Sequence, residues 1–181
     1  MGGRETKRSA WRAAWPWFLL AAALGLWLFV GGGRGAALPE GRRAPALTVE
    51  TTAGDFDLAA QEGKVVVLAF WATWCPACRA EGPALSRVHE RIRAAGDEVL
   101  GVSVDHEPLP QIARAARQLG MSYPIAKADR AALDRFQVEF LPTIYVIGPD
   151  GSIAESFTGP VGETQLLEAV QNARDQRLSS R

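Results

Sequence analysis

The chain has 181 residues, of which 48% are hydrophobic and 22% are charged, and its 20 basic residues balance 20 acidic ones. This length accommodates one domain with a proper core, and no Lys/Arg-rich run that would bind nucleic acid occurs after the N-terminal segment. Two cysteines are too few for a scaffold held together by disulfides, so their spacing is more informative than their number.

The N-terminal segment predicts a membrane anchor. Residues 13–33 are uncharged and largely apolar, and they follow a basic segment in residues 1–12. About twenty apolar residues span a bilayer as a helix, and basic flanks stay on the cytoplasmic side. We therefore predict a cytoplasmic N-terminus at 1–12 and a single-pass signal-anchor at 13–33 in the cytoplasmic membrane.

The part after the anchor is predicted to lie in the periplasm or another extracytoplasmic space. Residues 34–43 are rich in Gly, Arg and Ala and predict a flexible tether before a folded domain at 44–181. A cleaved signal peptide is the alternative to a retained anchor, because Gly35-Ala36-Ala37 offers small residues at a cleavage point. Either outcome exports the domain.

The first strong strand is predicted at Lys64 to Phe70, after weaker strand-like patches between Leu47 and Leu58. Its sequence, KVVVLAF, is typical of a strand buried on both faces. A helix should follow the two cysteines, since Leu85, Val88 and Ile92 recur at helical spacing.

The rest of the chain alternates between strands and helices. We predict strands at 99–104, 123–126, 143–147 and 152–157, and helices at 110–119, 131–136 and 163–178. The turn sequence Pro149-Asp150-Gly151 joins the last two strands in antiparallel fashion. This order predicts an α/β fold with a central mixed β-sheet flanked by helices.

The two cysteines lie where the first strong strand gives way to a helix, in the sequence Cys75-Pro76-Ala77-Cys78. Pro76 suits a first helical position, where the missing N–H is not needed. The N–H groups and dipole of a helix start stabilise a thiolate, which is the nucleophile in disulfide exchange. We therefore expect Cys75 to be the more acidic, exposed thiol that attacks, and Cys78 to be the shielded thiol that resolves the mixed disulfide.

Two other roles for this cysteine pair are less consistent with the sequence. A structural disulfide across two intervening residues would constrain the unfolded chain very little. A zinc site needs about four ligands, and His89 lies too far along the same helix to share a metal with Cys78. We predict redox chemistry by the cysteines, without a metal or another cofactor.

The segment from Phe70 to Pro83, FWATWCPACRAEGP, resembles the active-site segment of thioredoxin-like proteins of the TlpA/ResA (DsbE-like) type. The later sequence Phe140-Leu141-Pro142-Thr143, followed by a strand and Pro-Asp-Gly, matches the second landmark of that family. The resemblance extends from about Ala44 to the C-terminal helix. It implies a thioredoxin-like fold with a redox-active disulfide between Cys75 and Cys78.

The resemblance also implies a substrate site beside the cysteines. It predicts a cis peptide bond before Pro142, and backbone hydrogen bonds from Leu141 to an extended substrate. The residues that it places in contact with substrate are Trp74, Pro76, Leu141, Pro142 and Thr143.

Glu81 matches a glutamate near the active site in ResA-like proteins, and it is a candidate catalytic residue with Cys75 and Cys78. The buried aspartate of ordinary thioredoxin is absent, since Ala69 stands at the matching position. A buried Glu81 would have a raised pKa and could move protons during exchange, whereas a solvated helix glutamate would not. The sequence leaves both alternatives open.

The segment from Asp105 to Asp129 is longer than in plain thioredoxin, and the resemblance implies an extra helix and strand there. This segment could shape partner choice. His106 and Glu107 are interpreted as part of a solvated loop.

The resemblance favours a reductase of exported protein thiols, notably the haem-site cysteines of apocytochrome c in cytochrome c-type biogenesis. Electrons would come from a membrane thiol transporter, near which a tether would concentrate the domain. Two alternatives remain open at this point: a thiol oxidant or general disulfide exchanger, and an anchored binding module without catalysis. A peroxidase is less favoured, because no peroxide-activating site around a single cysteine is recognisable.

Overall fold

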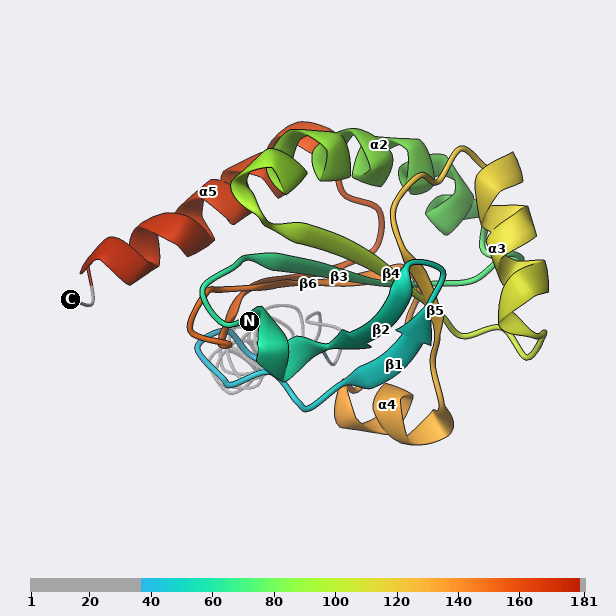
Figure 1. Cartoon of the computed structure of the whole chain (residues 1–181), viewed down its shortest axis with the longest axis horizontal. Coiled ribbons are helices and arrows are strands. Elements are labelled where there is room, and N and C mark those ends of the chain that lie inside the picture. The colour runs from blue at the N-terminus through green and yellow to red at the C-terminus, as the bar shows by residue number, and fades with distance from the viewer. Residues whose placement is uncertain (1–36, 180–181) are drawn as a thin grey trace, which may run out of the picture. The chain divides into compact units, whose positions relative to one another are not determined.

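The computed structural model describes residues 37–179 (Figure 1). The predicted cytoplasmic segment and signal-anchor lie outside these residues. Within the described part, none of the helices combines the length and apolar character that crossing a membrane requires.

A seven-stranded sheet runs through the domain in the order β2-β1-β5-β4-β3-β6-β7. Its strands are β1 Thr48–Thr51, β2 Gly54–Asp57, β3 Val66–Trp71, β4 Glu98–Ser103, β5 Ile125–Lys127, β6 Thr143–Ile147 and β7 Ile153–Thr158. The three strands β3, β4 and β5 are parallel neighbours, and the remaining pairings are antiparallel. The sheet is therefore mixed, as the sequence predicts.

Helices cover both faces of this sheet. They are α2 Pro76–Ile92, α3 Leu109–Gln118, α4 Arg130–Arg135 and α5 Glu163–Ser179, with short 3₁₀ turns at Leu58–Gln61 and Arg93–Ala95. Figure 1 shows α2, α3 and α5 on one side of the sheet and α4 on the other. The predicted strands and helices are confirmed within a few residues, including a helix, α3, and a strand, β5, in the segment from Asp105 to Asp129.

Strand β3 is buried along its whole length because its alternate side chains enter two different cores. Val67, Ala69 and Trp71 face the core under α2, α3 and α5, which also contains both cysteines. Val66, Leu68 and Phe70 face the other core, where Phe70 packs on Phe136 and Tyr145. This double burial fixes the direction in which β3 delivers the chain to the cysteine pair.

The flexible tether predicted for residues 34–43 is too long. Leu38 is completely buried, and its N–H donates to the Tyr145 hydroxyl at 3.1 Å. The Gly41 N–H donates to the Ile153 carbonyl, and Arg43 pairs with Ser152 as a β-bridge. The folded domain therefore begins at or before Leu38, not at Ala44, because an apolar side chain in this segment fills a gap in the core.

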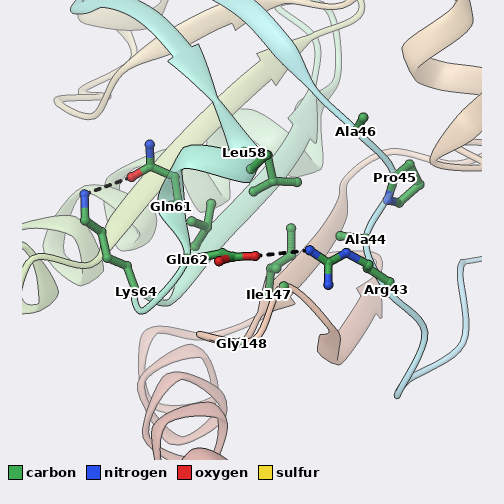
Figure 2. A pocket seen from close by; sticks show the side chains of 13 residues that line it. Arg43, Ala44, Pro45, Ala46, Leu58, Gln61, Glu62, Lys64, Ile147 and Gly148 are labelled. Carbon is green, nitrogen blue, oxygen red and sulfur yellow. Dashed lines mark hydrogen bonds and ion pairs between the residues drawn. The ribbon is translucent and has the colours of Figure 1, made fainter.

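A pocket of about 310 Å³ lies at the start of β3 and the end of β6, where Val66, Ile147 and Gly148 line it. Figure 2 shows two polar interactions there, an ion pair between Arg43 and Glu62 and a hydrogen bond from Lys64 to Gln61. The cysteines follow the opposite end of β3. This pocket is therefore separate from the predicted redox site.

Candidate active site

The cysteine pair occupies the junction between β3 and α2, as predicted. Cys75 is the N-cap residue of α2, with Pro76 in the first turn, and its Sγ accepts a hydrogen bond from the Cys78 N–H at 3.1 Å. The two cysteines are joined by a disulfide, and their Cα atoms are 5.3 Å apart. A thiolate at position 75 would meet the same N–H and the positive end of the helix dipole, both of which stabilise negative charge.

The expectation that Cys75 is exposed is wrong for this disulfide form. Cys75 retains 5% of its exposure and Cys78 retains 2%, so only the predicted order of the two holds. Both side chains belong to the core under α2, and Leu141 packs against that core. The sulfur atoms are therefore shielded by packing that the local motif does not reveal.

The loop before β6 brings the second family landmark to the same end of the sheet. Thr143 at the start of β6 pairs with Phe70, near the end of β3. The Leu141–Pro142 peptide bond is cis, which confirms the prediction. The Pro142 carbonyl accepts the Gly159 N–H at 2.8 Å, whereas no backbone hydrogen bond of Leu141 is found within residues 37–179. Leu141 can therefore offer its backbone to an extended polypeptide, although its role remains a prediction.

Two large apolar side chains near the site face solvent. Trp74, directly before Cys75, is 67% exposed, and Phe140, directly before Leu141, is 56% exposed. Pro76 is exposed as well. Trp74 and Pro76 are predicted substrate contacts, whereas Phe140 was missed, because a single aromatic residue in a loop carries no sequence signal of exposure.

Thr143 and Pro142 are buried, in contrast to the exposed predicted contacts Trp74 and Pro76. The Thr143 hydroxyl donates to the Phe140 carbonyl at 2.8 Å, so it holds the loop that carries Phe140 and Leu141. The structure thus gives Thr143 a supporting role in the loop.

Replacement of Thr143 by valine tests this supporting role. We expect Thr143→Val to lower the free energy of unfolding by about 1 kcal/mol, because the Phe140 carbonyl loses its partner. Urea denaturation measures this loss. Thr143→Ser retains the hydroxyl and is the control; equal stabilities of the valine and serine variants would contradict the role.

Glu81 is buried rather than solvated, which decides between the two alternatives that the sequence leaves open. It retains 5% of its exposure, and its Oε1 accepts the Val161 N–H at 2.6 Å. Burial raises the pKa of Glu81 from 4.5 to about 7, and the hydrogen bond from Val161 opposes part of that rise. A carboxyl group with this pKa can exchange protons near neutral pH.

Tyr123 interacts electrostatically with Glu81, which the sequence did not predict. It is buried, and its pKa is raised by that burial and, to a smaller extent, by the charge of Glu81. It lies just before β5, in the segment from Asp105 to Asp129. His106 and Glu107 of the same segment are exposed, in agreement with the interpretation as a solvated loop.

Comparison with known proteins assigns the family. Residues 41–156 match the model of the AhpC/TSA family. Over 132 residues, the chain is 30% identical to the thiol-disulfide oxidoreductase ResA of Bacillus subtilis (strain 168), covering 72% of this chain and 73% of that protein.

Solved structures agree with this assignment. A thiol:disulfide interchange protein of the thioredoxin family from Chlorobium tepidum TLS is 28% identical with a TM-score of 0.66, covering 76% of this chain and 99% of that chain. A putative thiol:disulfide interchange protein DsbE from Chlorobium tepidum has a TM-score of 0.69 at 24% identity, covers 76% of this chain and 99% of that chain, and supports the fold alone.

The family match covers the β3–α2 junction and the cis-proline loop together, and the relatives leave the non-catalytic binding module without support. The chain belongs to the AhpC/TSA family and is a thioredoxin-like thiol-disulfide oxidoreductase of the ResA type.

Proposed function

We propose that this oxidoreductase is anchored in the cytoplasmic membrane and reduces disulfides of exported proteins, apocytochrome c among them. A membrane thiol transporter would supply the electrons. The observation that carries the chemistry is the Cys75–Cys78 disulfide at the start of α2, beside the cis-proline loop. The reducing direction is supported by the resemblance to TlpA/ResA proteins, and the anchor by the apolar segment at residues 13–33.

The reaction proceeds through a mixed disulfide. The Cys75 thiolate attacks one sulfur of the substrate disulfide, which breaks the substrate S–S bond and releases the other sulfur as a thiolate that takes up a proton. Cys78 then loses its proton and attacks the Cys75 sulfur, which forms the internal disulfide and releases the second substrate sulfur as a thiolate that also takes up a proton. Two electrons and two protons pass to the substrate, and the enzyme ends in the disulfide form.

Glu81 fits the second of these steps. It lies one turn after Cys78 on α2, and its pKa of about 7 allows it to accept a proton near neutral pH. We assign it the proton that Cys78 must lose before it attacks. The exposed side chains of Trp74 and Phe140 and the backbone of Leu141 would contact the polypeptide that carries the substrate disulfide.

The variant Cys78→Ser tests the proposed function by trapping the mixed disulfide. Since Cys75 still attacks but nothing resolves the product, cells that express the full chain should accumulate reducible conjugates with exported proteins, including apocytochrome c. Non-reducing electrophoresis and mass spectrometry identify the partners.

The double variant Cys75→Ser/Cys78→Ser is the matched control and should trap nothing. Conjugates restricted to cytoplasmic proteins would contradict export. A wild-type enzyme found mainly as the disulfide in cells, despite a working transporter, would show that it acts as an oxidant.

A further inference from the structure

A buried carboxylate outside the cysteine motif, that of Asp105, accepts two hydrogen bonds from the loop that leads to Cys75. Asp105 retains 3% of its exposure and lies two residues after the end of β4. Its Oδ2 accepts the Thr73 N–H at 2.9 Å, and its Oδ1 accepts the Thr73 hydroxyl at 2.9 Å. Both oxygens therefore bind one residue, and that residue is separated from Cys75 only by Trp74.

Asp105 and the residues next to it are themselves held by several hydrogen bonds. The Ser103 hydroxyl donates to the Asp105 Oδ2 at 2.6 Å, and the Asp105 N–H donates back to that hydroxyl oxygen at 3.1 Å. The Val104 N–H donates to the Trp71 carbonyl, and Lys127 Nζ donates to the His106 carbonyl. The segment around Asp105 is thus bound to both neighbouring strands, β3 and β5.

The loop between β3 and α2 is packed at both ends, since Ala72 and Cys75 are buried in the core, but the residues between them make few other hydrogen bonds. Between the end of β3 and the start of α2, the Cys75 N–H donates to the Ala72 carbonyl at 3.2 Å, which closes a turn around Thr73 and Trp74. Trp74 itself is 67% exposed and adds little packing. The two hydrogen bonds from Thr73 to Asp105 therefore hold the middle of this turn, between its packed ends.

We propose that Asp105 is a positioning residue for the thiol-disulfide exchange. Through Thr73, it holds Cys75 at the N-cap of α2, where the Cys78 N–H meets the sulfur, and it fixes the direction in which Trp74 projects toward a substrate. The inference rests on the thiol chemistry assigned to Cys75, but it concerns a residue 30 positions further along the chain. A displacement of a reacting group by about 1 Å can lower a rate by orders of magnitude. Loss of the hydrogen bonds between Thr73 and Asp105 should therefore slow thiol-disulfide exchange.

Three variants of the full chain separate position from charge. Asp105→Ala removes both hydrogen bonds to Thr73. We expect the rate of reaction with glutathione disulfide to fall about tenfold and the pKa of Cys75 to rise. Asp105→Asn removes the charge but can keep the hydrogen bonds, since its carbonyl accepts the Thr73 N–H and its amide donates to the Thr73 hydroxyl oxygen. Its rate of reaction with glutathione disulfide should stay within about threefold of the wild-type rate. Thr73→Val keeps the charge and loses one bond, so it should slow the reaction about threefold and raise the pKa of Cys75.

Asp97 provides a matched control for simple loss of stability. It is a buried carboxylate at the opposite end of β4, it accepts the Val65 N–H at 2.8 Å, and it binds Arg174. Asp97→Ala should lower the melting temperature without changing the pKa of Cys75, which the ultraviolet absorbance of the thiolate reports as a function of pH.

Two outcomes would overturn the proposal. In the first, a folded Asp105→Ala or Thr73→Val variant keeps the wild-type rate and the wild-type pKa of Cys75. In the second, Asp105→Asn and Asp105→Ala both lower the pKa of Cys75, which would show that the carboxylate acts only as a nearby negative charge. A wild-type chain that reacts with no disulfide would instead refute the proposed function, so the two failures are distinguishable.

Discussion

Replacement of Cys75 by serine is expected to abolish disulfide reduction, with a loss of about a thousandfold or more in rate. Serine is close in size to cysteine and suits an N-cap, so the β3–α2 junction should keep its geometry. Its hydroxyl is not ionised near neutral pH, however, and cannot form a disulfide. The rate of reduction of a protein disulfide by the prereduced enzyme measures this loss.

The control for Cys75→Ser is Cys78→Ser, which removes the same internal disulfide but keeps the attacking thiol. It should consume one equivalent of substrate disulfide and then stop. Both variants should melt near the wild-type temperature, because a bridge between cysteines three positions apart closes a very short loop. Sustained turnover by Cys75→Ser would contradict the assignment of Cys75 as the nucleophile.

The second large effect concerns Glu81 and the dependence of stability on pH. The pKa of Glu81 is raised from 4.5 in the unfolded chain to about 7 in the folded one. Between these values the folded state holds a proton that the unfolded state has lost, so folding stability falls as the pH rises through this window. The fall for this single group is on the order of 3 kcal/mol, complete above about pH 7.

Glu81→Gln should remove this part of the pH dependence, because an amide has no proton to lose and can still accept the Val161 N–H. The oxidised protein is the appropriate sample, since disulfide-bonded cysteines do not titrate. Urea denaturation at pH values below and above the window should show that the free energy of unfolding of the variant increases relative to that of the wild type as the pH rises. Parallel curves for the two proteins would contradict a raised pKa.

The same variant tests the proton role in catalysis. With Glu81 as the acceptor for the Cys78 proton, the rate of internal disulfide formation should lose an inflection near pH 7 in Glu81→Gln. An unchanged pH profile, reduction potential and cysteine pKa would restrict Glu81 to the stability effect.

Local sequence signals predicted most of the fold and the reactive pair. The β-branched run of β3 and the turn sequence after β6 depend on neighbours in the chain, so their patterns are legible without tertiary information. Cys75 and Pro76 are likewise defined by their place at a helix start. The resemblance to a family added the cis bond before Pro142, which residue order alone does not predict.

The contacts that the sequence did not predict join residues far apart in the chain. Thr73 and Asp105 are 32 positions apart, and Glu81 and Val161 are 80 positions apart. No periodicity encodes such pairs, because they arise only when strands and helices pack. The same reason explains the error about Cys75, whose burial depends on the core that Leu141 joins from another part of the chain.

The buried position of Leu38 has a consequence for how the chain can be shortened. A fragment that starts at Ala44 would lack Leu38 and leave a cavity beside Tyr145, in the core on the face of the sheet away from the cysteines. A processing cut immediately after Ala37 would convert the Leu38 amide, which is hydrogen-bonded in the interior, into a charged ammonium group. The smallest self-sufficient catalytic unit should therefore retain at least Ala37 ahead of Leu38, so that the Leu38 nitrogen remains an amide.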